Sequence, residues 1–211
     1  MDDRGEYRAV GHRCAVDLGA LKLPISAEEA LHILTGQGFI ILEVDILKLA
    51  SQCIGTSSYR RGARPSEAPI VVDCSSFTKW LYGERGIWLP RRSIQQREKG
   101  KVVQLHEIVG GDLIFVSGRI DYWLDDPSDG VGHVGIVTDY KTVIHAANKQ
   151  VGVIETAVES FIGQGKFRGA RRYVSQDQRI LTLETPIHRE IETADDIRWI
   201  IMQSLPKKIP L

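Results

Sequence analysis

The sequence has few cysteines: only Cys14, Cys53 and Cys74 occur among its 211 residues, and no two of them have CxxC spacing. An odd number of cysteines without that spacing argues against a disulfide framework and against a zinc knuckle. A reducing compartment is therefore the expected environment. A cysteine that serves neither purpose is either a small core residue or a reactive thiol.

The sequence also lacks net charge and long apolar runs. Lys plus Arg and Asp plus Glu both number 27, so no basic excess indicates nucleic acid or an anionic membrane surface as a partner. No apolar run approaches the ~20 residues that span a bilayer. Four of the first six residues are charged, and no apolar signal segment follows them. We therefore expect a soluble, cytoplasmic protein, unless another route exports it.

The order of expected elements is helices first and a sheet afterwards. Ser26 to Glu29 form a capping box before an amphipathic helix, and Asp45 is placed to cap a second helix beginning at Ile46. Prolines at 65 and 69 make a regular element between 55 and 69 unexpected. Short alternating segments follow at 113–116, 133–138, 142–146, 151–156, 166–174 and 179–184, and a capped helix at 193–204. This order predicts an α+β fold with an antiparallel meander or small barrel.

The stretch Val71 to Tyr82 carries the first chemical signal. It begins apolar and extended, then takes a helical period with Phe77, Trp80 and Leu81 on one face. Cys74 falls at the junction, where the first N–H groups of a helix are unpaired and its dipole favours a thiolate. A thiolate attacks carbonyl carbon, so Cys74 is a candidate nucleophile that needs a base.

Two histidines are candidates for that base and its partner. His133 and His145 are twelve residues apart, with 139–141 as the turn between their strands. If Thr138 pairs with Thr142 around a three-residue loop, both histidines share one sheet face, whereas a two-residue loop puts them on opposite faces. One histidine could then take the thiol proton while the other orients it. Gly132 and Gly135 would leave room for a helix end beside the strand.

Two other interpretations of these residues stay open. Cys74 could be a buried, unreactive thiol beside two strand histidines with satisfied hydrogen bonds. The same three residues could instead bind a metal, although no fourth ligand stands at regular spacing. If Cys74 is instead a nucleophile with His133 and His145 as base and orienting partner, the protein is a cysteine hydrolase. Such an enzyme requires neither metal nor organic cofactor.

Several short motifs, in this order, resemble the NlpC/P60 family of papain-like cysteine peptidases, which cleave bacterial cell-wall peptides. The motifs are Asp73-Cys74-Ser75, Leu89-Pro90-Arg91-Arg92-Ser93, Gly111-Asp112-Leu113-Ile114-Phe115, His133-Val134-Gly135-Ile136 and Ile144-His145-Ala146. The resemblance covers roughly residues 55–156. It implies a catalytic domain at 45–174 with extensions at 1–44 and 175–211, and a Cys74–His133–His145 triad.

The resemblance also implies a substrate, a muropeptide cleaved between γ-D-glutamyl and a diamino acid. The family positions that hold the free amine of a terminal L-alanine correspond to Asp73, Ser75 and Ser93, and a tyrosine lining the site corresponds to Tyr59. Asp73 could equally cap the helix, or do both. The alternatives are an acyltransferase or amidase of the same superfamily and a non-catalytic, toxin-like binding module. Ser76 departs from the family, which usually has glycine there.

Overall fold

The computed structural model describes residues 7–174 and 178–206 and contains two compact units. The first combines Met1–Val44, Gly83–Trp88 and Gln176–Leu211, and the second combines Asp45–Tyr82 with Leu89–Ser175. Residues 1–6, on which the expectation about a signal segment depends, lie outside the described residues. No helix in the described part of the chain is long and apolar enough to cross a membrane.

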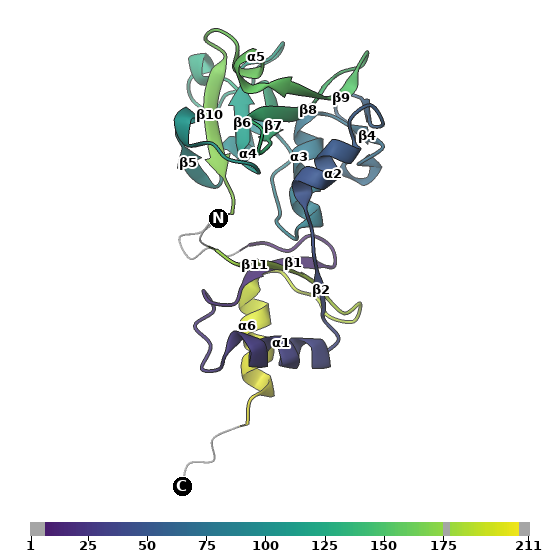
Figure 1. Cartoon of the computed structure of the whole chain (residues 1–211), viewed down its shortest axis with the longest axis vertical. Helices are drawn as coiled ribbons and strands as arrows, with labels where there is room; N and C mark the ends of the chain where they lie inside the picture. The colour runs from purple at the N-terminus through teal and green to yellow at the C-terminus, as the bar shows by residue number, and fades with distance from the viewer. Residues whose placement is uncertain (1–6, 175–177, 207–211) are drawn as a thin grey trace. The chain divides into compact units, whose positions relative to one another are not determined.

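The first unit is a three-stranded antiparallel sheet in the order β1-β11-β2, with two helices on one side (Figure 1). Its elements are β1 (Arg13–Asp17), α1 (Ala27–Gly36), β2 (Ile40–Leu42), β11 (Ile180–Glu184) and α6 (Ala194–Ser204). Strand β1 is the element that the sequence did not predict.

Both helices of this unit begin as the sequence predicts. Ser26 accepts from the Glu29 N–H, and Glu29 accepts from the Ser26 N–H, so the capping box is confirmed. Thr193 and Asp196 form the equivalent box at α6. Apolar residues of the two helices and the sheet form one core, with the buried members Cys14, Val16, Leu18, Leu21, Ala30, Leu34, Phe39, Leu183, Ile191, Ala194, Ile197, Ile200 and Ile201.

The second unit is built on a six-stranded antiparallel sheet in the order β5-β10-β6-β7-β8-β9 (Figure 1). Strands β6 to β9 form the expected meander, and β10 returns to pair with β6 and β5. The fold is thus α+β, as predicted. The strands are β5 (Lys101–Val103), β6 (Leu113–Val116), β7 (His133–Val137), β8 (Thr142–Asn148), β9 (Gly152–Ala157) and β10 (Phe167–Arg172).

Four helices accompany this sheet: α2 (Ile46–Gln52), α3 (Cys74–Glu84), α4 (Ser93–Arg97) and α5 (Val158–Ile162). Asp45 accepts hydrogen bonds from the first N–H groups of α2, as expected of its N-cap. In α3, Phe77 and Leu81 are fully buried and Trp80 is half-buried, so the predicted apolar face is the one that packs inward.

One expectation about this unit is wrong. The segment 55–69 contains strand β3 (Ser58–Tyr59), which pairs in parallel with β4 (Val71–Val72), and a single 3-10 turn at Pro65–Glu67. The two prolines do not prevent this, because proline is well tolerated in the first turn of a helix and β3 lies before both of them.

Candidate active site

Cys74 lies at the first position of α3, which follows β4 directly. Asp73 is the cap of this helix: its Oδ1 accepts from the Ser76 N–H at 2.8 Å, and the Ser76 hydroxyl accepts from the Asp73 N–H at 2.8 Å. The two residues thus satisfy each other in the manner of a capping box. Ser76, where the family usually has glycine, is fully buried and completes the cap. This cap fixes the direction in which α3 leaves β4, and with it the place of the thiol.

The Asp73 carboxylate is held by Arg91, eighteen residues further along the chain. Two guanidinium nitrogens donate to the two carboxylate oxygens, at 3.0 Å and 2.5 Å, and also bond the Ser75 hydroxyl and the Ala63 carbonyl. Burial raises the pKa of Asp73, but hydrogen bonds and charge from Arg91 and N–H groups of Ser76 and Gly62 outweigh it and keep the pKa below its ordinary value. Asp73 is therefore an ionised carboxylate whose charge is already compensated.

The hairpin of β7 and β8 has the register on which the triad depends. Ile136 pairs with Ile144 and Val137 with Val143, and the Thr138 N–H donates to the Thr142 carbonyl at 2.8 Å. The loop thus contains three residues, 139–141, as predicted. His133 and His145 consequently share a face, and their rings meet with Nε2 of His133 2.8 Å from Nδ1 of His145.

The glycines near His133 serve a different purpose from the one expected. A Cβ on Gly135 would lie 2.3 Å from the Val143 side chain and 3.0 Å from the His145 Cβ. A Cβ on Gly132 would meet the backbone at Gly118 and a carboxylate oxygen of Asp121. The two glycines therefore make room for β8 and for the segment after β6, and not for a helix end.

The histidine pair has a third member that the sequence patterns did not indicate. Nε2 of His145 lies 3.0 Å from the hydroxyl of Thr156 in β9. If that nitrogen donates its proton to Thr156, Nδ1 of His145 is an acceptor, and His133 donates to it from Nε2. Nδ1 of His133 is then unprotonated, the state that a base for Cys74 requires.

Substitution of Thr156 tests this series of hydrogen bonds from Thr156 through His145 to His133. We expect Thr156→Val to leave the fold unchanged and to lower kcat/KM by about tenfold, because it removes only the partner that fixes the tautomer of His145. Thr156→Ser keeps the hydroxyl and should retain most of the activity. Steady-state kinetics of both variants provide the measurement, and equal rates for valine and serine would contradict the assignment.

Phe161, from α5, covers both imidazole rings. Its ring centroid lies 5.5 Å from that of His133 and 4.8 Å from that of His145. Burial lowers the pKa of His133 to about 3, with a further decrease from His145 and a smaller opposing effect of Asp73, and burial lowers the pKa of His145 to about 4. Both histidines are therefore neutral at neutral pH.

The pKa of the Cys74 thiol differs from the expectation based on the helix dipole. Burial, followed by the charge of Asp73, raises the pKa of Cys74 to about 12, although N–H groups of Val134 and Ser75 and the Arg91 charge act in the opposite direction. This direction is opposite to the expected preference for thiolate, because burial outweighs the N–H groups and the Arg91 charge. Burial thus disfavours the charged forms of Cys74 and of both histidines.

These low histidine pKa values predict acid sensitivity. The pKa values of both histidines in the folded protein lie below 6.5, so the unfolded chain binds more protons between pH 6.5 and about 3. The contribution of the two histidines to the free energy of unfolding is therefore complete above pH 6.5 and is lost as the pH falls. We expect the free energy of unfolding to decrease by about 2 kcal/mol or more between pH 6.5 and 4. Urea unfolding across this range measures it, and His145→Gln should reduce the slope. A pH-independent stability there would refute the prediction.

All seven residues predicted for the site line one cleft of about 1390 Å³ within the second unit. Tyr59 contributes from β3, and burial, Cys74 and Asp73 raise its pKa. Ser75 is engaged by Arg91 and Asp73. Ser93 is buried at the first position of α4, directly after the N-cap residue Arg92. Among the described residues, no group of three or more His, Cys, Asp or Glu side chains could hold a metal ion.

A helix that begins at a cysteine and packs with an antiparallel sheet bearing a histidine pair is the arrangement of a papain-like domain. The model of the NlpC/P60 family matches residues 55–172, more than half of the chain, and this protein belongs to that family. A solved NlpC/P60 family protein from Bacillus cereus superposes with a TM-score of 0.53 at 25% identity, covering 62% of this chain and 40% of that one.

Relatives that match this chain in sequence have names of peptidases. A probable endopeptidase of Corynebacterium glutamicum is 33% identical over 92 residues, 43% of this chain and 38% of that protein. A γ-D-glutamyl-L-lysine dipeptidyl-peptidase of Bacillus cereus is 33% identical over 104 residues, 48% of this chain and 29% of that protein. These alignments span well under half of either relative's length.

Proposed function

We propose that this protein is a cysteine peptidase that hydrolyses amide bonds in bacterial cell-wall peptides, between γ-D-glutamyl and a diamino acid. The observation that carries the proposal is the 2.8 Å contact of His133 with His145, in the cleft that Cys74 also lines. Membership of the NlpC/P60 family and the γ-D-glutamyl specificity in the name of the Bacillus cereus relative support it.

In the proposed reaction, Nδ1 of His133 takes the Cys74 proton as the sulfur attacks the amide carbonyl carbon. The resulting oxyanion is stabilised by backbone N–H groups at the start of α3, including that of Cys74. As the intermediate collapses, the C–N bond breaks and His133 returns the proton to the leaving amine. Water, deprotonated by His133, then cleaves the thioester to a free acid and restores the thiol.

His145 and Thr156 act through His133 in this scheme. The His133 Nε2–H bond to His145 holds the ring so that Nδ1 faces the thiol, and it stabilises the imidazolium that forms during attack. The low pKa of His133 gives a short-lived imidazolium that readily returns its proton to the departing amine. Burial that disfavours the charged forms of Cys74 and His133 is consistent with a base that acts only in the transition state.

Mass spectrometry of defined muropeptides after incubation with the protein tests this function. We expect two products, a peptide ending in a free γ-carboxyl group and one beginning with the diamino acid. A product in which the acyl group is joined to an added amine or alcohol would indicate an acyltransferase instead. Unchanged substrates, across muropeptides with lysine and with diaminopimelate, would refute the proposed activity.

A further inference from the structure

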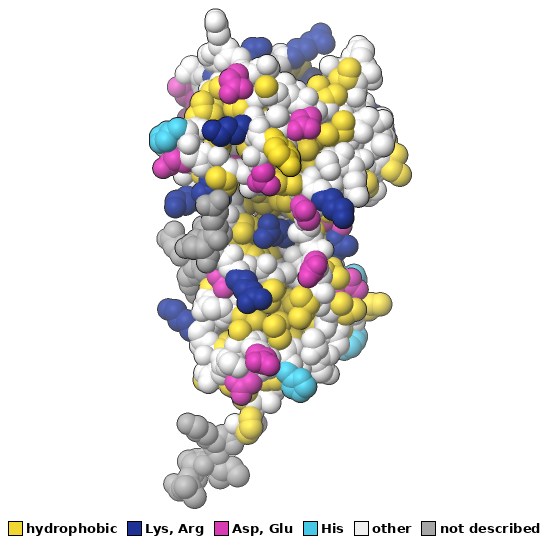
Figure 2. Space-filling view, viewed as in Figure 1, with side chains coloured by type: hydrophobic (Ala, Val, Ile, Leu, Met, Phe, Trp, Pro, Cys, Tyr) yellow, Lys and Arg dark blue, Asp and Glu magenta, His cyan; other side chains and the backbone are white. Residues whose placement is uncertain are grey.

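The cleft around Cys74 is strongly cationic, although the whole chain has no net charge. Six lysine or arginine side chains line it against a single carboxylate, that of Asp73. The cations are Arg61, Arg91, Arg92, Arg119, Lys149 and Lys166. On the face shown in Figure 2, in contrast, acidic and basic side chains are interspersed. The positive charge is therefore concentrated at the site.

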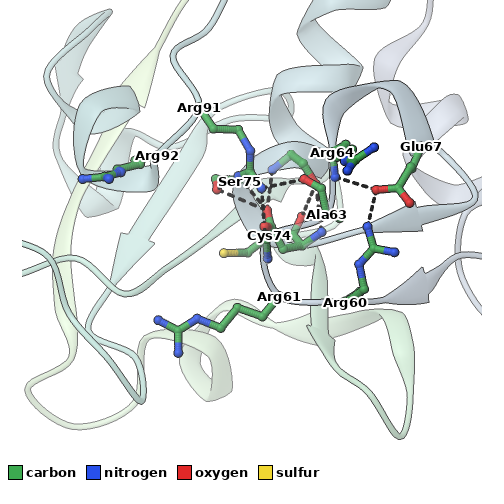
Figure 3. A network of polar contacts seen from close by, with 12 residues as sticks. Arg60, Arg61, Ala63, Arg64, Glu67, Cys74, Ser75, Arg91 and Arg92 are labelled. Carbon is green, nitrogen blue, oxygen red and sulfur yellow. Dashed lines mark hydrogen bonds and ion pairs between the residues drawn. The ribbon is translucent and has the colours of Figure 1, made fainter.

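Only Arg91 among these cations has an ion pair within the described residues, and it compensates Asp73. Arg61 and Arg92 lie on the side toward which the Cys74 sulfur points, whereas Arg60, Arg64 and Glu67 gather on the other side (Figure 3). Two guanidinium groups thus line the same cleft as Cys74, and no carboxylate of the described residues pairs with them.

Tyr122 connects these two arginines. Its hydroxyl accepts a hydrogen bond from Arg61 at 3.0 Å, and the Arg92 guanidinium carbon lies 5.5 Å from its ring centroid, in cation–π contact. The segment that carries Tyr122 is held by the Tyr122 N–H, which donates to the Val131 carbonyl at 3.1 Å, and by Asp129, which accepts from Arg97 at 2.7 Å. Tyr122 therefore holds both guanidinium groups in the cleft.

We propose that Arg61 and Arg92, positioned by Tyr122, bind carboxylates of the substrate, and that the enzyme selects γ-linked acidic peptides over their amidated forms. A γ-glutamyl amide bond consumes the side-chain carboxyl group and leaves the α-carboxylate free beside the scissile bond. Planar guanidinium groups bind carboxylates through paired, charge-assisted hydrogen bonds. This inference rests on the proposed peptidase function and assigns its substrate class.

The same charges disfavour an ammonium group near Cys74. Asp73, the residue that the family resemblance assigns to the amine of a terminal L-alanine, is compensated by Arg91, and every other charged side chain lining the cleft is positive. We therefore expect a free α-carboxylate to favour binding, and a free amino terminus not to.

The test uses a pair of γ-glutamyl peptides that differ only in a free or amidated α-carboxyl group. We expect kcat/KM of the wild-type protein to be about tenfold or more higher for the free acid, as one lost charge-assisted interaction corresponds to about a factor of ten. Arg61→Gln/Arg92→Gln should bring the ratio of the two kcat/KM values close to one, because it raises KM for the acid much more than KM for the amide. Arg64→Gln, a neighbouring arginine outside the cleft lining, is the matched control and should keep the preference.

Tyr122 is a positioning residue in this proposal, and its variants separate that role from a general effect on folding. Tyr122→Phe keeps the ring beneath Arg92 and loses only the hydrogen bond to Arg61. Its preference for the free acid over the amide should therefore lie between that of wild type and that of Tyr122→Ala. Both variants should raise KM for the free acid more than KM for the amidated peptide. A uniform loss with both peptides would show that Tyr122 acts on folding and not on recognition.

Binding to the Cys74→Ala variant distinguishes failure of this inference from failure of the proposed function. Tighter binding of the acid than of the amide by calorimetry supports the inference even if neither peptide is cleaved. Equal affinities, no binding of either peptide, or a preference that persists in the double arginine variant would overturn it. Cleavage of both peptides at equal rates would leave a peptidase without charge selection.

Discussion

Replacing Cys74 with alanine is expected to lower kcat/KM for muropeptide hydrolysis by at least about 10⁴-fold, because no other group can form the thioester. The fold should persist. Alanine is smaller than cysteine by one atom, and the Asp73–Ser76 cap that begins α3 does not involve the thiol. Initial rates on a defined muropeptide and thermal unfolding by circular dichroism measure the two effects.

Cys53→Ala is the matched control for this substitution. Cys53 is also a buried thiol in the second unit, at the end of α2, and burial raises its pKa as it does that of Cys74. It does not line the cleft, so its removal should leave kcat/KM within about twofold of wild type. Undiminished hydrolysis by Cys74→Ala would mean that another residue is the nucleophile, and a loss in both variants would indicate a folding defect.

Local patterns predict much of this fold because local interactions form the elements concerned. The boxes at Ser26 and Thr193 and the Asp45 cap each involve residues within four positions in sequence. The β7–β8 register is also local, since a three-residue loop fixes the pairing of both strands. That register brings His133 to His145, so the spacing of the two histidines predicts their shared face once the loop is known to have three residues.

Contacts that depend on distant pairing could not be derived in the same way. Strand β1 is recognised only through β11, with Cys14 paired to Leu183, and its own residues mix charge with apolar runs. Phe161 comes from a five-residue helix without a distinctive pattern. Thr156 is an intermediate case: the β8–β9 register, in which His145 faces Ile154, places Thr156 diagonally beside His145 on the same face.

The thiol pKa shows a different limit of reasoning from sequence. A cysteine at a helix start predicts a stabilised thiolate, and the position is correct. Its pKa depends instead on how completely the surrounding chain removes water from Cys74, and on the charge of Asp73. Burial is a property of the assembled domain, so the sequence alone places Cys74 at the start of a helix without giving its ionisation state.

Arg91→Met is expected to lower the free energy of unfolding by about 3 kcal/mol, because it leaves the Asp73 carboxylate buried without its counter-charge. The substitution also removes the hydrogen bonds to Ala63 and Ser75. Activity should fall as well, since the Asp73 cap that positions Cys74 loses its support. Urea unfolding of wild type and variant, followed by circular dichroism, gives the difference in free energy.

Two further variants test whether the uncompensated charge of Asp73 causes the loss of stability in Arg91→Met. In Asp73→Asn/Arg91→Met no charge remains to be compensated, so the double variant should be more stable than Arg91→Met alone, a non-additivity that a double-mutant cycle measures. Arg60→Met breaks the exposed pair of Arg60 with Glu67 and should cost less than about 1 kcal/mol, as is usual for surface ion pairs. If Arg91→Met costs no more than Arg60→Met, Asp73 does not depend on Arg91, and its carboxylate becomes available to a substrate ammonium after all.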